Sequence, residues 1–375
     1  MRKAKLADRI AREIEDSIVA GRWSSGTPLG NEAAIVAERG VSRWTVREAV
    51  RMLEVDGLVE SRRGGGGGLF VGAPVADFVA SRLAHYLEFV GIDADEIGEV
   101  WNRVGPALIL DAAPHLEPAD LEELAALAIP AEGEELGVGF NRVRRIDDVI
   151  SRRSGNPALV LAAAVISQLA LHAGWYSTLD DEAYEALFPP LISHFQDSAA
   201  ALARGDVDEA AEAFRDYTTA SLPLIRSSPL IERASVRPGA IERAYRIYPG
   251  IRPVKKADMV TGALRDMIFE AGWPVGLNIG TEPELMARFG VGRAVLREAT
   301  RALERVGVVR TSRGAAGGLI VAEPDPAAVI DCCHRHLRRE GTTPANLAEV
   351  RALVAACTGT RLKPLLLTAM DIDNS

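Results

Sequence analysis

Cysteine is scarce in this chain of 375 residues, which contains only Cys332, Cys333 and Cys357. An odd, clustered set without a framework spacing excludes a disulfide-built fold and indicates a reducing compartment. Long apolar runs are also missing, since no uninterrupted run of apolar residues reaches about 18. The charged N-terminus is followed by no apolar segment of the signal-peptide kind. We therefore expect a cytoplasmic protein that does not bind membranes.

Aromatic residues make up only 5% of the chain, whereas alanine and leucine are abundant. This bias favours a mainly helical fold. The 48% of hydrophobic residues suffices for ordinary cores, and the length indicates two or three domains.

Positive charge is in deficit overall, with a net charge of −9, which argues against a protein that coats nucleic acid non-specifically. The deficit lies in the middle of the chain. Residues 75–250 hold 14 Lys and Arg against 28 Asp and Glu, while residues 1–74 hold 12 against 10 and residues 251–323 hold 11 against 8. Two slightly basic ends flanking an acidic middle are compatible with two nucleic-acid-facing modules.

The chain contains a long internal repeat, because residues 1–75 recur 250 positions later without a gap. Glu32 recurs as Glu282, and the run from Gly40 to Gly57 recurs from Gly290 to Gly307 with its arginines in place. The unit is too long for a solenoid repeat and corresponds to a whole small domain.

The sequence of each copy predicts three helices followed by a β-hairpin. In the first copy the helices are expected from Leu6 to Ile18, from Asn31 to Arg39 and from Arg43 to Val55, with Asn31 and Ser42 as caps. The strands are expected at 58–61 and 69–71, around a glycine-rich tip. In the second copy Thr281 and Glu284 form a capping-box pattern. This order predicts a winged helix-turn-helix domain in each copy.

The third helix of each copy carries arginines at four-residue spacing, on the side opposite its apolar face. Arginine suits both guanine edges and phosphates, and hydroxyls near a helix start suit phosphates. We therefore predict DNA contacts for the residues of these helices and of the wings: Ser42, Arg43, Thr45, Arg47, Arg51, Arg63, Arg293, Arg297, Arg301 and Arg313. An ordinary solvated helix face is the alternative, and the preservation of these arginines in both copies argues against it.

Two other functions are disfavoured. The glycine run 64–68 is followed by a strand and by no lysine, so it does not fit a nucleotide-binding loop. No nucleophile–base pair or catalytic metal motif stands out, so we do not expect an enzyme.

The segments Val41–Ala49 and Leu53–Val59, with the glycine-rich wing, resemble the DNA-binding domain of GntR-family bacterial transcription regulators over about 70 residues in each copy. The middle of the chain, with Ser154-Gly155-Asn156-Pro157 and Ser193-His194, resembles the family's all-helical effector domain of the FCD type, of the seven-helix fatty-acid-regulator kind. Seven helices are expected there, at about 75–90, 95–113, 118–129, 139–153, 157–173, 184–203 and 207–226.

The resemblance implies a mainly α architecture in five parts. These are a winged domain at 1–74, an FCD-like effector and dimerisation domain at 75–228, a linker at 229–254, a second winged domain at 255–324, and a partial helical segment at 325–375 that resembles the start of a second FCD domain. It also implies a homodimer that binds a short palindromic operator and responds to a small-molecule effector, such as an organic acid.

The chain departs from the family pattern in three places. The second helix lacks the family's DNA-holding arginine in both copies. The family's metal set of one Asp and three His reduces here to Asp147, His194 and Asp216, which could hold a divalent ion or line a metal-free pocket. The family has an arginine in this pocket that contacts effector carboxylates, and this chain has Trp101 at that position. The equivalent position of the second copy still has an arginine, Arg351.

Cys332, Cys333, His334 and His336 form a cluster of residue types that can bind a metal ion. No second ligand pair follows at the spacing of a zinc finger, so buried or surface cysteines without a metal are favoured. The sequence thus predicts a DNA-binding transcriptional regulator, a repressor by default. A further hypothesis is that the two modules of one chain act as a built-in pseudo-dimer. The alternative is an effector-binding or scaffold protein whose DNA modules have weakened.

Overall fold

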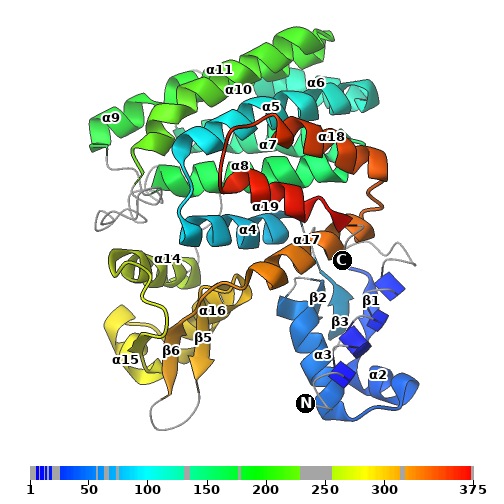
Figure 1. Cartoon of the computed structure of the whole chain (residues 1–375), viewed down its shortest axis with the longest axis vertical. Helices are drawn as coiled ribbons and strands as arrows, with labels where there is room; N and C mark the ends of the chain where they lie inside the picture. Colours follow the sequence, from blue (N-terminus) through cyan, green and yellow to red (C-terminus); the bar gives the residue numbers. More distant parts are fainter. Residues whose placement is uncertain are drawn as a thin grey trace.

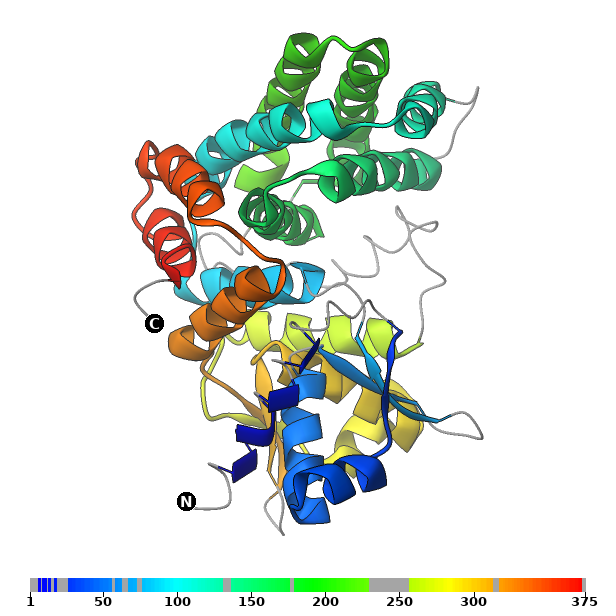
Figure 2. The same cartoon turned by 90° about the vertical axis from the view of Figure 1, so that its right-hand side faces the viewer.

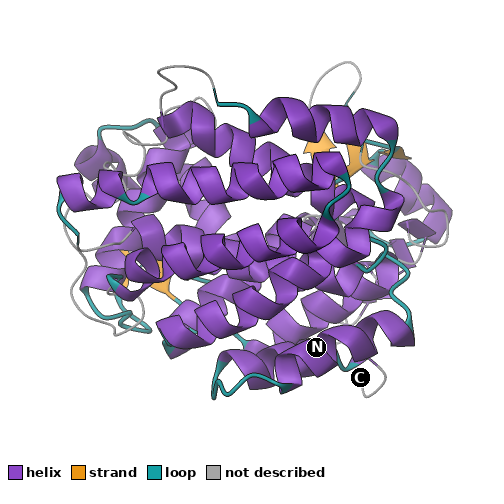
Figure 3. Ribbon diagram, turned by 90° about the horizontal axis from the view of Figure 1, so that it is seen from above, coloured by secondary structure: helices purple, strands orange, loops and turns teal. Residues whose placement is uncertain are grey.

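Helices form the upper part of the molecule and two winged domains lie side by side beneath them (Figures 1 and 2). The computed structural model describes residues 6–7, 9–11, 13–14, 17–18, 26–55, 58–62, 67–72, 76–130, 136–175, 179–228, 256–312 and 317–372. Seen from above, the helices cover almost the whole molecule (Figure 3). No helix in these ranges is long and apolar enough to cross a membrane.

The first winged domain contains the predicted helix-turn-helix and hairpin. Its described elements are β1 (Pro28–Gly30), α2 (Glu32–Arg39), α3 (Arg43–Val55), β2 (Val59–Arg62) and β3 (Gly68–Val71). The Asn31 side chain accepts a hydrogen bond from the Ala34 N–H, and Gly40 ends α2 with φ at 61°, a conformation that favours glycine. The predicted Asn31 cap is therefore confirmed, and together with Gly40 it fixes the turn that orients α3.

The second winged domain repeats this arrangement. Its elements are α14 (Lys256–Glu270), β4 (Asn278–Gly280), α15 (Glu282–Phe289), α16 (Arg293–Arg305), β5 (Val309–Ser312) and β6 (Gly318–Val321). The strand orders β1-β3-β2 and β4-β6-β5 match, and the pairing of Val59 with Val71 recurs as Val309 with Val321. The Thr281–Glu284 capping box is confirmed. The short edge strands β1 and β4 were not predicted.

The helical body follows the first winged domain. Its elements are α4 (Ala76–Val90), α5 (Ala94–Ala112), η1 (Ala113–His115), α6 (Pro118–Ala128), α7 (Leu136–Arg153), α8 (Pro157–Trp175), α9 (Asp181–Ala186), α10 (Phe188–Arg204) and α11 (Val207–Arg226). The single helix expected at 184–203 is wrong, because the chain breaks at Leu187 into α9 and α10. Pro189 and Pro190 explain the break, since proline is tolerated in the first turn of a helix and not in its interior.

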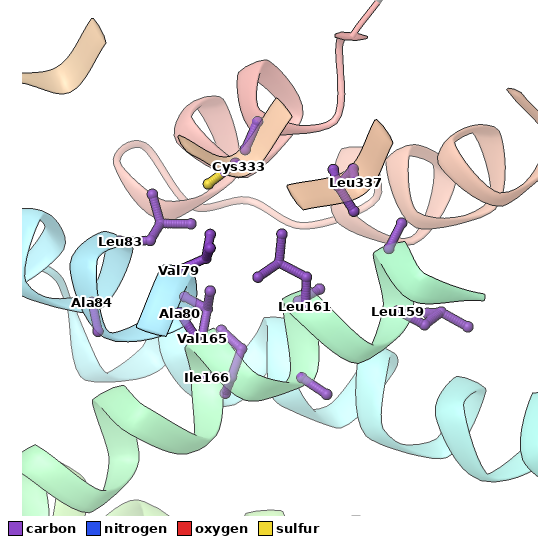
Figure 4. Close-up of a cluster of buried hydrophobic side chains, with 14 of the residues drawn as sticks. Val79, Ala80, Leu83, Ala84, Leu159, Leu161, Val165, Ile166, Cys333 and Leu337 are labelled. Carbon is purple, nitrogen blue, oxygen red and sulfur yellow. The ribbon is translucent and has the colours of Figure 1, made fainter. Parts of the chain in front are cut away.

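The C-terminal segment folds as α17 (Pro326–Arg339), α18 (Pro344–Ala355) and α19 (Leu362–Ala369). It does not form a separate domain: α17 contacts α4, and α18 contacts α5 and α8. In Figure 4, Cys333 of α17 lies near Val79 and Leu83 of α4. Leu337 of α17 lies over α8, near Leu159 and Leu161, and all of these side chains are fully buried. The segment therefore completes the core of the helical body. The predicted linker 229–254 lies outside the described residues.

Candidate nucleic-acid interface

The exposed face of α3 presents three arginines. Arg43 is exposed, and the side chains of Arg47 and Arg51 are 68% and 70% exposed. The opposite face is buried through Val46, Ala49, Val50 and Leu53. The sequence produces this division because apolar residues recur at helical spacing on one side only, so the arginines must face solvent.

The helix α16 presents the equivalent arginines. The side chains of Arg293 and Arg297 are 66% and 56% exposed, and Arg301 is exposed. Its buried face consists of Leu296, Ala299 and Leu303. The predicted arginines of both third helices are therefore available to a ligand, whereas the predicted wing contacts Arg63 and Arg313 lie outside the described residues.

A glutamate at the start of the preceding helix holds these arginines in both copies. Arg47 Nε donates to Glu32 at 2.9 Å, and Arg293 and Arg297 lie 2.9 and 3.3 Å from Glu282. Glu48 pairs with Arg51 and not with Arg47, because side chains three residues apart are neighbours on a helix. The repeated glutamate therefore sets the arginine positions before any ligand arrives.

The two predicted hydroxyls differ in access. Ser42 is exposed and its Oγ caps α3 by accepting from the Thr45 N–H at 3.2 Å. Thr45 is only 3% exposed, and its hydroxyl lies 2.9 Å from that of Ser42. Thr45 therefore stabilises the start of α3 from within, and the phosphate contact predicted for it stays a prediction.

Both arginine faces line one groove between the winged domains, with a volume of about 2640 Å³. Arg43, Arg47 and Arg51 contribute from one side, and Arg297 and Arg301 from the other. A ligand that enters the groove meets both third helices at once. Ala33 and Pro283, which occupy the place of the missing family arginine, also line it.

Trp44 is a further exposed residue of α3 that the sequence analysis missed. Its side chain is 53% exposed and lines the groove beside Arg43, while the second copy has Ala294 there. Its helical position, off the face formed by Val46 and Val50, is the signal that could have revealed it. The two third helices thus share their arginines and differ in their apolar contacts.

The family model for bacterial regulatory proteins of the gntR family matches residues 6–69 and 256–317, which contain both third helices. Both winged domains belong to the GntR family. The Exu regulon transcriptional regulator of Escherichia coli (strain K12) is 30% identical over 131 residues, 35% of this chain and 50% of its own length. The HTH-type transcriptional repressor NanR of Citrobacter rodentium is 39% identical over 82 residues, 22% of this chain and 31% of its own.

The Uxu operon regulator of Haemophilus influenzae is 45% identical over 58 residues, 16% of this chain and 22% of its own length. The chain spans about half the length, or less, of these curated relatives. The family model itself covers the two GntR domains. The FCD type of the helical body stays a prediction.

The second GntR domain is joined to the helical body by a buried ion pair. Arg265 of α14 donates to Glu88 of α4 at 2.6 Å, and both side chains are at most 5% exposed. His172 of α8 lies 2.6 Å from the other Glu88 oxygen. Phe89 and Trp273 pack edge to face beside this cluster, with centroids 5.4 Å apart. The orientation of α14, and with it of α16, depends on this contact.

The charges in this cluster shift its ionisation strongly. Burial would raise the pKa of Glu88, but Arg265 and then His172 outweigh it and hold that pKa far below its ordinary value. Burial and Arg265 lower the pKa of His172. Burial and Arg265 also lower the pKa of His85 to about 3. The cluster therefore consists of a charged Glu88–Arg265 pair beside two neutral imidazoles at neutral pH.

Among the described His, Cys, Asp and Glu side chains, those of His85, Glu88 and His172 lie close enough to share a metal ion, with ligand atoms within 4.8 Å of one another. Arg265 already supplies the positive charge that an ion would bring to Glu88. The donor set therefore fits an ion pair with its hydrogen-bonding histidine better than a metal centre.

The predicted metal residues Asp147, His194 and Asp216 are not such a group in the described part of the chain. Asp216 is exposed, because it lies off the α11 face that buries Phe214 and Thr218. His194 and Asp147 are half-buried on α10 and α7. The family resemblance gives the order of these residues along the chain and does not fix the rotation of their helices.

Trp101, the fourth predicted pocket residue, is 4% exposed and belongs to an aromatic cluster. Its ring lies 6.4 Å from that of Phe214 and 5.2 Å from that of Tyr217, and Phe195 packs 4.8 Å from Tyr217. Burial, and then the charge of Asp147, raises the pKa of the Tyr217 hydroxyl. Aromatic rings thus occupy the centre where an effector pocket was expected.

The cysteines and histidines of α17 serve the core. Cys332 and Cys333 are buried, and burial raises the pKa of the Cys333 thiol well above its ordinary value. His334 Nε2 lies 3.0 Å from the Thr368 carbonyl of α19, and burial lowers the pKa of His336 to about 4. These side chains fasten α17 to its neighbours, in agreement with the interpretation favoured from sequence.

Proposed function

We propose that this protein is a sequence-specific DNA-binding transcriptional regulator in which both GntR domains contact DNA. The observation that carries the proposal is the repeated arginine face: Arg47 and Arg297 are exposed, line the same groove and are held by equivalent glutamates. Guanidinium groups at the start of a helix suit bidentate recognition of guanine and binding of phosphate.

The glutamate partners do not prevent DNA binding. Exposed ion pairs such as Arg47–Glu32 contribute roughly 0–1 kcal/mol, so a phosphate or guanine can replace the carboxylate. Arginines that neutralise phosphates also release counterions from the duplex, which favours binding at low salt. The arginines are therefore held in place without being blocked.

Repression is the proposed direction of regulation, by occupation of a site that RNA polymerase needs. The C. rodentium relative is named a repressor, which supports this direction without establishing it for this chain. For the effector we retain a small organic acid bound by the helical body near Trp101, Asp147, His194 and Asp216. Because aromatic rings fill the centre of this region, we propose that the response to the effector is weak.

A second candidate function is an effector-binding or scaffold protein whose DNA modules have weakened. It is supported by Ala33 and Pro283, which line the groove where the family's arginine would stand. Loss of a phosphate or base contact of this kind costs on the order of 1–3 kcal/mol. Coupling of two modules in one chain can offset such a loss through effective concentration.

Selection of bound duplexes from a random pool, at a stated salt concentration, separates the two candidates. The wild-type protein should enrich a defined site, and the double variant Arg47→Ala/Arg297→Ala should not. The exposed Arg204 lies on α10, away from the groove, so Arg204→Ala is the matched control. A wild-type protein that enriches no sequence at micromolar concentration would favour the scaffold function.

A further inference from the structure

The C-terminal segment repeats the first helices of the helical body and packs against them. At the 250-residue offset, α17 corresponds to α4 and α18 to the first part of α5. In the structure α17 contacts α4 and α18 contacts α5. Each helix therefore lies against the helix of which it is a copy.

Contact between an element and its own copy is what a two-fold axis produces in a symmetric dimer. We propose that this chain is a pseudo-dimer, in which α17 and α18 occupy the place of a second subunit's α4 and α5, and that a single chain binds one DNA duplex with two related but non-identical half-sites. The proposal rests on the DNA-binding function proposed above, and it replaces the homodimer that the family resemblance implied.

Buried polar groups hold the copied helices in this place. The Asn156 side chain, 0% exposed at the start of α8, donates to the Asn346 carbonyl at 3.2 Å and to Glu349 at 2.9 Å. Glu96 of α5 accepts from the backbone N–H groups of Thr360 and Leu362 at 2.6 and 2.8 Å. These bonds tie the first turn of α18 and the start of α19 to the first copy, and the fully buried Leu337 adds an apolar contact on α17.

The ion pair between α4 and α14 is also a contact between the two copies of the repeat, since it joins the first copy's fourth helix to the second copy's first helix. We call this pairing of one copy with the other the crossed arrangement. At the repeat offset Glu88 corresponds to Arg338 and Arg265 corresponds to Glu15, so both charges are reversed. Glu15 lies outside the described residues. Pairing of Glu88 with the first copy's own Glu15 would bring like charges together, so the sequence itself favours the crossed arrangement.

The crossed arrangement brings both GntR domains to one side of the helical body (Figures 1 and 2) and their arginine faces to one groove. The residues of the two third helices that face the groove are not identical. Trp44 and Ala294 stand at equivalent positions, as do Ser42 and Gly292, while the arginines are shared. Small and aromatic apolar side chains contact the thymine methyl group differently, so the two half-sites should share an arginine-read part and differ beside it.

Native mass spectrometry of the full chain, alone and with a selected duplex, tests the proposal. The expected results are a free chain of 40.2 kDa and a complex of one chain per duplex. A free dimer, or two chains per duplex, would overturn the pseudo-dimer and leave DNA binding intact. A chain that is monomeric and binds no duplex would overturn the DNA-binding function instead.

A substitution in α17 tests whether the surface that α17 covers can bind a second chain. Leu337→Asp should release α17, increase hydrogen exchange over 326–369 and produce a species of twice the mass, because the freed face can accept a second chain. Leu110→Asp, at a position 46% exposed on α5, is the matched control and should remain monomeric. If Leu337→Asp does not fold, Glu349→Gln provides a milder release. A released segment in a chain that stays monomeric would overturn the assignment of this surface.

The half-site difference has its own test. Trp44→Ala gives the first domain the residue of the second, so DNA selection with this variant should yield half-sites more alike than those of the wild-type protein. Unchanged half-sites, or identical half-sites with the wild type, would overturn the proposed asymmetry.

Discussion

Arg265 and Glu88 lie 177 positions apart in the chain and form a buried ion pair at 2.6 Å. Removal of the guanidinium in Arg265→Met leaves Glu88 charged and buried. Loss of one partner of a buried pair typically costs about 3–5 kcal/mol. We expect native-state hydrogen exchange to show a fall of this size in the free energy of opening of α14.

The matched control for this substitution is Glu209→Gln, which breaks the exposed Arg204–Glu209 pair, whose side chains are 57% and 56% exposed. Such a pair contributes less than about 1 kcal/mol. Opening energies for α14 that are equal in Arg265→Met and in the wild type would show that the second GntR domain is held by other contacts.

Acidification should weaken the same junction through His85. Burial and Arg265 lower its pKa to about 3, whereas an unfolded histidine titrates near 6.5. Between these two values the unfolded state binds the extra proton, so stability falls as the pH drops from 6.5 towards 3. Urea unfolding at pH 7.5, 6.0 and 5.0 should show a smaller loss in His85→Gln than in the wild type. The exposed His115 provides the control His115→Gln, which should keep the wild-type slope; equal slopes in all three proteins would refute this role for His85.

The C-terminal segment should respond to pH in a lower range. Burial would raise the pKa of Glu96, but hydrogen bonds from the N–H groups of Leu362, Thr360 and Arg361 outweigh it and lower the pKa below its ordinary 4.5. The ionised group therefore stabilises the fold above pH 4.5, and this contribution is lost as the pH falls through the lowered pKa. Glu96→Gln should lower the melting temperature at pH 7 and have a diminishing effect on acidification.

The exposed Glu122 of α6 is the control for this comparison. Glu122→Gln should leave the melting temperature close to that of the wild type across the range. A melting temperature of Glu96→Gln that stays below the wild type by the same amount at every pH would contradict the role assigned to the carboxylate.

Removal of the glutamates that hold the arginines should strengthen binding to non-specific DNA. Glu32→Gln and Glu282→Gln each remove a competitor for Arg47 or Arg297 and a charge that repels phosphate. The gain should reach at most about fivefold, since an exposed pair contributes no more than about 1 kcal/mol. Glu38→Gln, on the same helix as Glu32 but paired with Arg39, should have no effect. Weaker binding by Glu32→Gln to every sequence would show that holding Arg47 in position contributes more to DNA binding than removal of the competing carboxylate gains.

The winged domains could be predicted from the sequence because their signals are local. Asn31 and Gly40 bound α2 by capping and a left-handed backbone, and the apolar spacing of α3 determines which side its arginines face. The same local signals were sufficient for most helices of the body. The exception at Leu187 arose because two prolines were read as part of a continuous helix.

The contacts between distant segments could not be predicted in this way. Glu88 and Arg265 look like ordinary surface charges on their own helices, and they become buried only when α4 and α14 meet. The position of α18 depends on the hydrogen bond from Asn156 to Asn346, 190 positions away. The sequence around Asn156 indicates the start of a helix but does not indicate this partner. The order of Asp147, His194 and Asp216 likewise contains no information on whether their helices turn these side chains together.

Titration of the selected duplex with single-module variants tests most directly whether both GntR domains read DNA. Arg47→Ala and Arg297→Ala should each weaken binding to the full site by about 1–3 kcal/mol, and Arg204→Ala should not weaken it. Comparable losses in the two variants would support two working modules in one chain. Full affinity in either variant would show that one module is dispensable and would contradict the account.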